Sequence, residues 1–248
     1  DPKEHWLVSS TERMQIEEGK TKRDIEIVRE PIPYLKIFTD IPILGVWFAA
    51  IAELLYVQLV SQYEPVYFNK YLDFDLLNSG FMSALPIIVQ FIAKLIAGFA
   101  SDSLSCISPT ANVRLFNTFA LGVSGIMMVA LAFVPRSQQT LCVVTLTAAV
   151  SFTGFCTAGF NKAATLRSRQ HAHFVMTVIM NIWSFTILVE PFIVDPILTD
   201  PTNGHQWAIV FLIHGAFAFV ANIVFLVVSD ARPAKWTYSV LETVSTKL

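Results

Sequence analysis

The sequence predicts an all-α membrane protein with six transmembrane helices, and three observations support this prediction. Of the 248 residues, 54% are hydrophobic and only 15% are charged, whereas about a quarter of the residues are charged in an average soluble domain. Six apolar segments are each long enough to cross a hydrocarbon layer, which takes roughly 20 helical residues. Positive charges are concentrated in every second link between these segments. A single segment of this kind could be the core helix of a large soluble protein, but six in succession do not fit that class.

The chain divides into a charged N-terminal segment, a six-helix bundle and a short tail. Residues 1–40 carry mixed charges without a long apolar run, so we expect a cytoplasmic loop. Residues 229–248 are expected to form a cytoplasmic tail. The bundle covers 41–228, and its predicted spans are about 41–60, 80–99, 115–134, 141–160, 174–194 and 207–228.

The distribution of Lys and Arg predicts the orientation of these spans. Fourteen of the seventeen lie in the N-terminal segment, in the links after the second and fourth spans, and in the tail. The opposite side holds only Lys70 and Arg136, and Lys94 lies inside the second span. Both termini of this chain are therefore expected to be cytoplasmic.

Composition and motifs argue against several other functions. The net charge of −2 is close to neutral, so nucleic acid is an unexpected partner. The three cysteines show no spacing typical of a metal site, and there is no P-loop, GxSxG or HExxH motif. The sequence therefore predicts no catalytic site, no metal site and no cofactor.

A set of short motifs recurs in the order and spacing of a known family. The motifs are DPKEHWLVSSTERMQIEEG, FTDIPILGVW, NSGFMSALPIIVQ, GFASDSL followed by VR, TAGFN, MN, WAIVFLI and SDARPAKW, spread over residues 1–237. They resemble the C-terminal half of the anion:cation symporter family of the major facilitator superfamily. That family includes sodium–phosphate cotransporter-like proteins, sialin and the vesicular glutamate transporters.

The resemblance implies a function as well as a fold. The fold would be one half of a transporter, built from two inverted three-helix repeats at about 41–134 and 141–228, with an N-terminal six-helix half as its partner. The function would be secondary active transport of a small solute, an organic or inorganic anion, by alternating access coupled to H⁺ or Na⁺. The membrane would be a plasma, lysosomal or vesicular membrane. A receptor or scaffold that keeps the fold without transporting is the alternative.

Glu53 is the most informative residue, because it lies about 18 Å of helix rise beyond Ile41, close to the centre of a bilayer. A charged side chain at that depth costs at least about 2.5 kcal/mol, so it normally faces a cavity or a partner. It could line the transport cavity as a proton carrier or cation site, belong to a buried structural network, or lie nearer an interface. In the resembling family this position is an arginine that meets the anionic substrate, so Glu53 reverses the expected charge. A second departure is KAATLRSRQHA after GFN, which lacks the family's aspartate.

Four further polar residues inside the spans are candidates for a substrate or ion cavity. Gln90 is close to Glu53 in depth, whereas Lys94, one turn on, is expected to reach the headgroups. Glu190 precedes Pro191 near the outer end of its span, where a broken helix could serve an ion site or a simple kink could leave an acid at the mouth. Asn181 and His214 either line the cavity or hydrogen-bond within the bundle, and His214 could also relay protons.

The link after the second span contains GFASD and, further on, an arginine. In this superfamily such a set of glycine, acid and base latches two helix ends in the outward-facing state. The resemblance therefore predicts a gating loop in which Gly98 allows close approach and Asp102 caps or pairs with Arg114. An ordinary capped loop with one stop-transfer arginine is the alternative.

Overall fold

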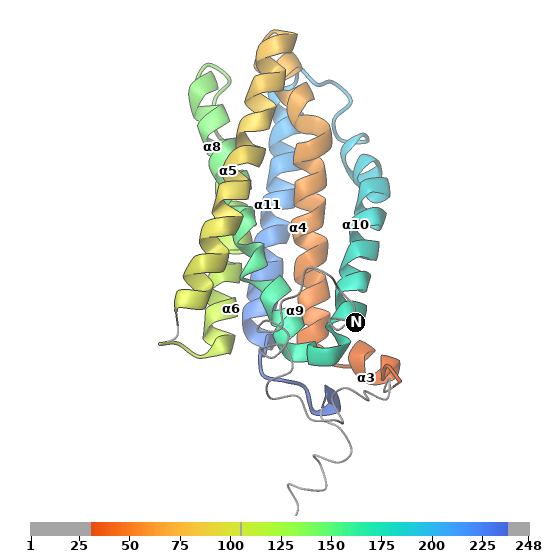
Figure 1. Ribbon diagram of the computed structural model, residues 1–248. Coiled ribbons are helices and arrows are strands. Elements are labelled where there is room, and N and C mark those ends of the chain that lie inside the picture. Colours follow the sequence, from red (N-terminus) through yellow and green to blue (C-terminus); the bar gives the residue numbers. More distant parts are fainter. Residues whose placement is uncertain (1–30, 105, 238–248) are drawn as a thin grey trace, which may run out of the picture. The chain divides into compact units, whose positions relative to one another are not determined.

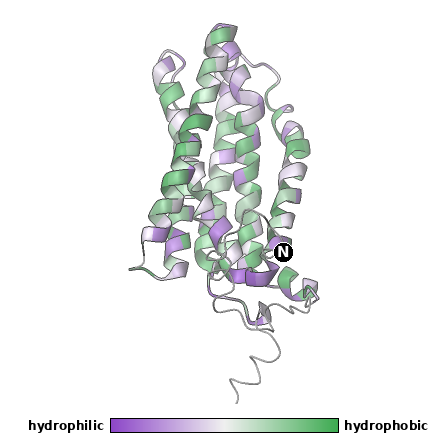
Figure 2. Cartoon of the chain, viewed as in Figure 1, coloured by the Kyte–Doolittle hydropathy of each residue, from purple (hydrophilic) through white to green (hydrophobic). Residues whose placement is uncertain are grey.

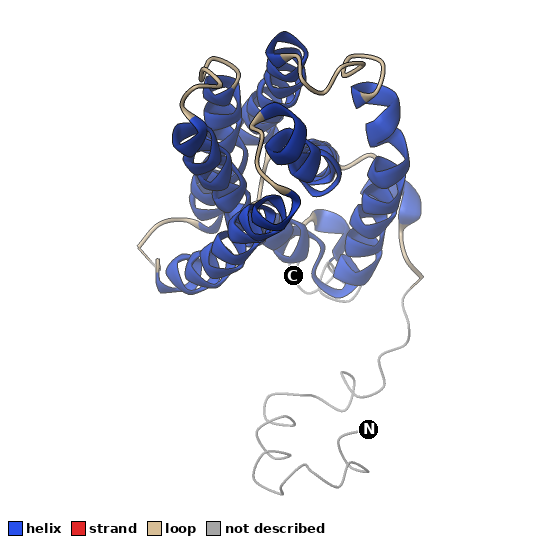
Figure 3. Cartoon of the chain, turned by 90° about the horizontal axis from the view of Figure 1, so that it is seen from above, coloured by secondary structure: helices blue, strands red, loops and turns tan. Residues whose placement is uncertain are grey.

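The computed structural model describes residues 31–104 and 106–237, and from Tyr34 onward these residues belong to one unit. Most of the predicted N-terminal segment and of the predicted tail lies outside them. All regular structure in the described part is helical, which confirms the all-α prediction (Figure 3). The division of the chain at residues 40 and 228 stays a prediction.

The helices follow one another along the chain with short interruptions (Figure 1). They are α3 (Tyr34–Phe38), α4 (Ile41–Val66), η1 (Tyr67–Tyr71), α5 (Leu76–Ser103), α6 (Pro109–Asn117), η2 (Thr118–Val123), α7 (Ser124–Leu131), α8 (Gln139–Thr153), η3 (Gly154–Thr157), α9 (Phe160–Ser168), η4 (Arg169–His171), α10 (Ala172–Val194), α11 (Gly204–Val228) and η5 (Lys235–Thr237).

Five helical stretches in the described residues are long and apolar enough to cross a membrane. One of them, Gln139–Val194, has 56 residues, and an unbroken helix of that length would measure about 84 Å, more than twice the thickness of a hydrocarbon core. It is broken at η4, where Arg169 adopts a left-handed backbone conformation with φ of 45°. The chain reverses there, so α8–η3–α9 and α10 run in opposite directions (Figure 1).

Helix starts follow from local capping. Helix α4 begins after Asp40 with Pro in its first turn, and the Asp40 side chain makes no cap hydrogen bond. At the start of α6, the Ser108 side chain accepts a hydrogen bond from the backbone N–H of Ala111. The Asn203 side chain accepts one from the N–H of His205 at the start of α11. Such caps satisfy backbone N–H groups that have no partner inside the helix. We call the end of the bundle where α4 begins the Asp40 end, and the end where it stops the Tyr67 end.

Helix α4 lies at the centre of the bundle and packs against α9, α10 and α11. In the most apolar stretch of α4, 67% of the residues are buried, whereas only 17% are buried in the corresponding stretch of α5. Large apolar side chains on α5 and α10, among them Phe81, Phe99 and Phe192, are exposed. The colours of Figure 2 show hydrophobic residues along much of both helices. A soluble monomer rarely exposes apolar surface on this scale, and lipid or another apolar surface would cover it.

A close helix crossing joins α7 to α11. A Cβ atom built on Gly125 would stand 2.7 Å from the backbone oxygen of Gly215, and one built on Gly215 would stand equally close to the oxygen of Gly125. Only glycine fits on either side of such a contact, as in other small-residue crossings of membrane helices. This crossing fixes the position of the residue that precedes Gly215, which is His214.

Candidate functional site

Glu53 lies in the middle of α4 and points into the bundle, with only 5% of its surface exposed. The thiol of Cys156 on η3 lies close to its carboxyl group, and the ammonium group of Lys94 on α5 lies within electrostatic reach. The thiol also accepts a hydrogen bond from the Asn161 amide, with 3.7 Å between nitrogen and sulfur. We call Glu53, Lys94, Cys156 and Asn161 the Glu53 cluster. Four segments, α4, α5, η3 and α9, thus each supply one polar side chain to a cluster in apolar surroundings.

The close approach of α5 to η3 holds this cluster together. A Cβ atom on Gly154 would stand 2.7 Å from the backbone oxygen of Gln90 and 3.1 Å from the backbone nitrogen of Lys94. Beside it, the Gln90 amide donates to the Thr153 hydroxyl across 2.6 Å. Gln90 therefore ties α5 to α8, and its hydrogen bond goes to Thr153 instead of Glu53.

Lys94 lies close enough to Glu53 and Cys156 for its charge to act on both. That it reaches the headgroups stays a prediction. Its side chain is half-buried, so it borders the cluster on one side and open space on the other. Cys156 was not among the predicted residues, because a lone cysteine in an apolar run is normally a small hydrophobic residue.

Glu190 and His214 are brought together from α10 and α11. His214 Nε2 lies 3.0 Å from Glu190 Oε1, and the two side chains are 4% and 0% exposed. Glu190 is therefore fully buried and does not lie open at a mouth. His214 is ten residues inside α11, about 15 Å from its first residue, and Glu190 lies in the last turns of α10.

Asn181 does not join either group. Its side chain is exposed on α10, and its amide donates to the backbone oxygen of Thr177 one turn back, at 2.9 Å. Another acid was missed: Glu64 on α4 is only 4% exposed, and its Oε1 atom has no hydrogen-bond partner among the described residues. It lies beside Tyr67, Trp207 and other aromatic residues. Sequence reasoning missed it because Glu64 lies just beyond the predicted first span.

The predicted gating loop has different partners from those expected. Asp102 pairs with Lys162 on α9 at 2.7 Å, and Arg114 instead donates to the hydroxyl and backbone oxygens of Ser229 at 3.1 and 2.7 Å. The structure therefore does not bring Asp102 and Arg114 together, because the end of α11 occupies the arginine, and the gating role of this loop stays a prediction. Space around Gly98 is open, since a Cβ atom added there would have no atom of the described residues within 4 Å, so it supports no close approach within this chain.

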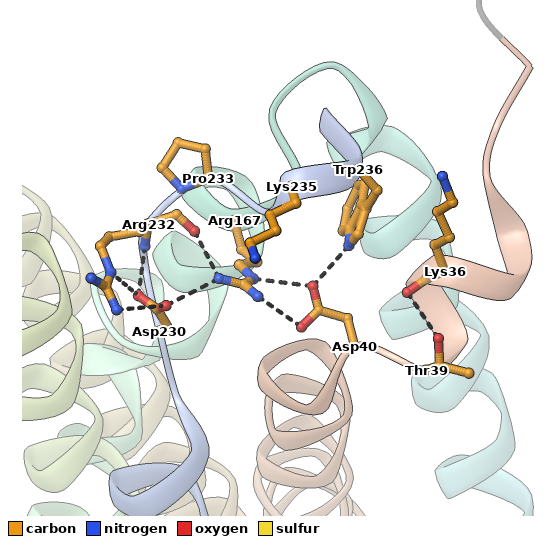
Figure 4. A pocket seen from close by; sticks show the side chains of 9 residues that line it. All are labelled: Lys36, Thr39, Asp40, Arg167, Asp230, Arg232, Pro233, Lys235 and Trp236. Carbon is orange, nitrogen blue, oxygen red and sulfur yellow. Dashed lines mark hydrogen bonds and ion pairs between the residues drawn. The ribbon is translucent and has the colours of Figure 1, made fainter. Parts of the chain in front are cut away.

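The Asp40 end carries a second polar network, centred on Arg167 (Figure 4). Arg167 donates to both carboxylate oxygens of Asp40 at 3.0 and 3.1 Å, and to Asp230 at 3.1 Å. Trp236 adds a hydrogen bond to Asp40 at 2.8 Å. We call Asp40, Arg167, Asp230, Arg232 and Trp236 the Arg167 network; it joins the start of α4, the end of α9 and the segment after α11.

The acidic and basic side chains of the Arg167 network neutralise one another. Burial raises the pKa of Asp230, but hydrogen bonds from Arg232 and the charges of Arg232 and Arg167 outweigh it, so the pKa lies below its usual value. An open cavity of about 870 Å³ borders the network, with Lys36 and Lys235 on its rim (Figure 4). Among the described residues, no group of three or more His, Cys, Asp or Glu side chains is arranged to hold a metal ion.

Comparison with known proteins gives one consistent group of relatives, although no family model matches the chain. Over 243 residues, 95% of the chain, it is 26% identical to vesicular glutamate transporter 1 of Xenopus laevis, 25% to vesicular glutamate transporter 2.1 of Danio rerio and 24% to vesicular glutamate transporter 2 of Homo sapiens. The aligned part is 41% of each relative, so the chain spans about two-fifths of the length of the curated relatives it matches. The chain is thus an all-helical, multi-pass membrane protein that resembles the C-terminal half of a major facilitator superfamily transporter of the anion:cation symporter family.

Proposed function

We propose that this chain forms the C-terminal half of a secondary active transporter, which moves a small organic or inorganic anion by alternating access coupled to H⁺. The observation that carries the proposal is the Glu53 cluster, in which a buried acid in the middle of α4 lies within electrostatic reach of a half-buried lysine. The relatives named as vesicular glutamate transporters support the solute class. An N-terminal half, as in the family that the chain resembles, would supply the opposite wall of the cavity.

The cluster suggests how a proton and an anion could be moved together. While Glu53 is ionised, its charge neutralises that of Lys94, and an anion gains little from approaching. When Glu53 takes up a proton, the positive charge of Lys94 is left uncompensated in apolar surroundings, where charge interactions are strong. Anion binding then restores neutrality. Proton and anion would thus bind as a pair, which is the requirement for symport.

This scheme also accounts for the reversed charge at Glu53. The family arginine offers a permanent positive charge at that position, whereas here the positive charge would come from Lys94 on the neighbouring helix and would depend on the state of Glu53. We therefore propose Glu53 as the proton-binding residue, Lys94 as the anion-binding residue and Gln90 as the residue that holds α5 in place. Na⁺ remains the competing coupling ion, with Glu53 as its ligand.

The test is uptake into proteoliposomes that contain the full-length protein. Labelled glutamate, phosphate, sialate, an organic cation and a neutral sugar would each be offered under an inward proton gradient, an inward sodium gradient, and neither. We expect uptake of at least one anion, driven by the proton gradient. Uptake driven only by sodium would overturn the coupling ion, and uptake of the cation or the sugar alone would overturn the role of Lys94.

A receptor or scaffold without transport is the second candidate, and the charge reversal at Glu53 favours it. Here Glu53 and Lys94 would form a permanent structural pair. The same vesicles would then show no flux of any solute under either gradient, while equilibrium binding would still detect a ligand.

A further inference from the structure

The cavity of about 870 Å³ at the Asp40 end has a wall built from three distant parts of the chain. They are the end of α3 with the turn after it, the end of α9 and the segment after α11 (Figure 4). Ligand sites in proteins typically measure about 300–1,000 Å³. The cavity is therefore large enough for a group of the size of a sugar phosphate.

The wall carries more positive than negative charge, since four basic and two acidic side chains line the cavity. The two acids are Asp40 and Asp230, and the arginines of the Arg167 network pair with both of them. The other two basic side chains are Lys36 and Lys235, which are exposed and form no ion pair with another described residue. Their two charges are left over, so the cavity favours an anion as its ligand.

Arg232 can provide a third contact to such an anion. Its Nε and Nη2 atoms donate to Asp230 at 3.0 and 3.2 Å, whereas Nη1 donates to no group among the described residues. Guanidinium and ammonium groups are the usual partners of phosphate oxygens. Lys235 lies between Arg232 and Lys36 along the wall in the view of Figure 4. Three donors spread in this way fit a ligand with several negative groups better than a single small ion.

The rim of the cavity at α3 is apolar as well as basic. Tyr34, Leu35 and Phe38 are 54%, 79% and 49% exposed, and Lys36 lies among them in the sequence. Proteins place aromatic and aliphatic side chains beside lysine where lipid meets water, and a water-soluble anion would gain nothing from this surface. The distribution of Lys and Arg predicts that the Asp40 end faces the cytoplasm, and the cytoplasmic leaflet holds the anionic lipids.

We propose that this cavity binds the headgroup of an anionic membrane lipid that carries more than one phosphate. Lys36, Lys235 and Arg232 bind the phosphates, while the acyl chains lie against Leu35 and Phe38 on α3. A lipid bound in this way joins the segment before α4 to the segment after α11. The site lies at one end of the bundle and needs no transported solute, so the inference goes beyond the transport proposal and stands without it.

Binding of a fluorescent short-chain phosphatidylinositol bisphosphate to the full-length protein in dodecyl maltoside micelles tests the site. One lysine near an anionic headgroup contributes about fivefold in affinity. Lys36→Gln and Lys235→Gln should therefore each weaken binding about fivefold, and the double variant roughly twenty- to thirtyfold. Both side chains are exposed, so neither substitution disturbs the core. Lys70→Gln, which replaces an exposed lysine at the Tyr67 end, is the matched control and should bind like the wild type.

Two competitors separate a lipid from a free phosphate compound. Water-soluble inositol trisphosphate has the charges of the headgroup without acyl chains, and short-chain phosphatidylcholine has the chains without a net charge. Neither should displace the probe at concentrations at which unlabelled phosphatidylinositol bisphosphate does. Leu35→Gln, at an exposed position of α3, should weaken binding of the lipid and leave binding of inositol trisphosphate unchanged.

Three results would overturn the proposal. Wild-type affinity in the double lysine variant would show that the cavity is not the site. An equal loss in Lys70→Gln would show that the lipid responds only to the total charge of the protein. Displacement by inositol trisphosphate at the same concentration as by the unlabelled lipid would assign the cavity to a free anion.

Discussion

At the scale of single residues, three buried acids in this bundle follow one rule: each has a partner that can neutralise it. Glu64, whose Oε1 atom has no hydrogen-bond partner among the described residues, is the exception. Glu53 has Lys94 and the Cys156 thiol, Glu190 has His214, and Asp40 has Arg167. An uncompensated charge at these depths would cost several kcal/mol. The rule gives each partner a measurable role.

Arg167 offers the clearest stability test. Its guanidinium group binds Asp40 through two parallel hydrogen bonds and reaches Asp230 with a third nitrogen. A lysine cannot reproduce this fork, because its donors lie on one nitrogen. We expect Arg167→Lys to lower the free energy of unfolding by about 1–3 kcal/mol, since Asp40 is left buried with fewer donors. Thermal unfolding in detergent would measure this.

Arg232 provides the matched control, because it also pairs with Asp230 but its side chain is 81% exposed. Exposed pairs contribute little to stability, so Arg232→Lys should not measurably change the unfolding temperature. Equal effects of the two substitutions would contradict the role given to burial.

The sequence predicted some of these residues and not others, for physical reasons. Glu53 was predictable, because a charge in the middle of an apolar run must avoid lipid. The pairing of Glu190 with His214 was not, because it depends on how far α11 rises above the end of α10. Lys162 as the partner of Asp102 was hidden for a similar reason, since the reversal at η4 sets the position of α9.

At the scale of elements, hydropathy locates the apolar part of each helix but not its ends. Helix α4 continues to Val66 and α5 begins at Leu76, beyond the predicted spans of 41–60 and 80–99, because polar residues outside the hydrocarbon still form helix. The interruptions at η2 and η3 carry no proline signal. They depend on packing between helices, which a single segment does not reveal.

The α7–α11 crossing makes a prediction at this scale. Gly125→Ala would place a methyl group 2.7 Å from the backbone oxygen of Gly215, and backbone cannot move aside cheaply. We expect the free energy of unfolding to fall by about 1–3 kcal/mol, the usual cost of overpacking. Denaturation in mixed micelles would measure it.

Gly98→Ala is the control for this experiment, because nothing in the described residues lies within 4 Å of its added methyl group. Alanine is the better helix former by up to about 1 kcal/mol, so this variant should be unchanged or more stable. A Gly125→Ala protein as stable as the wild type would show that the helices are not in close contact.

At the scale of the whole molecule, alternation of helix direction predicts which segments share a side of the membrane. The segments 106–108 and 229–234 lie at the Asp40 end, and the links at 132–138 and 195–203 lie at the Tyr67 end. The excess of Lys and Arg at the Asp40 end predicts that this end is cytoplasmic.

Single cysteines provide the measurement of sidedness in intact cells. In a full-length protein whose other accessible cysteines are replaced, a cysteine at Ser137 or Thr202 should react with a membrane-impermeant reagent added outside the cytoplasm. A cysteine at position 106 or at Arg232 should react only after permeabilisation. Labelling of all four positions from one side would contradict the six crossings.

Coupled transport through Glu53 is the central claim, and one comparison tests it most directly. In proteoliposomes that contain the full-length protein, Glu53→Gln mimics the protonated acid, so it should abolish anion uptake driven by a proton gradient while preserving exchange of labelled for unlabelled anion. Glu64→Gln, which also changes a buried acid of α4, should retain both. Proton-driven uptake by Glu53→Gln at the rate of the wild type would contradict the claim.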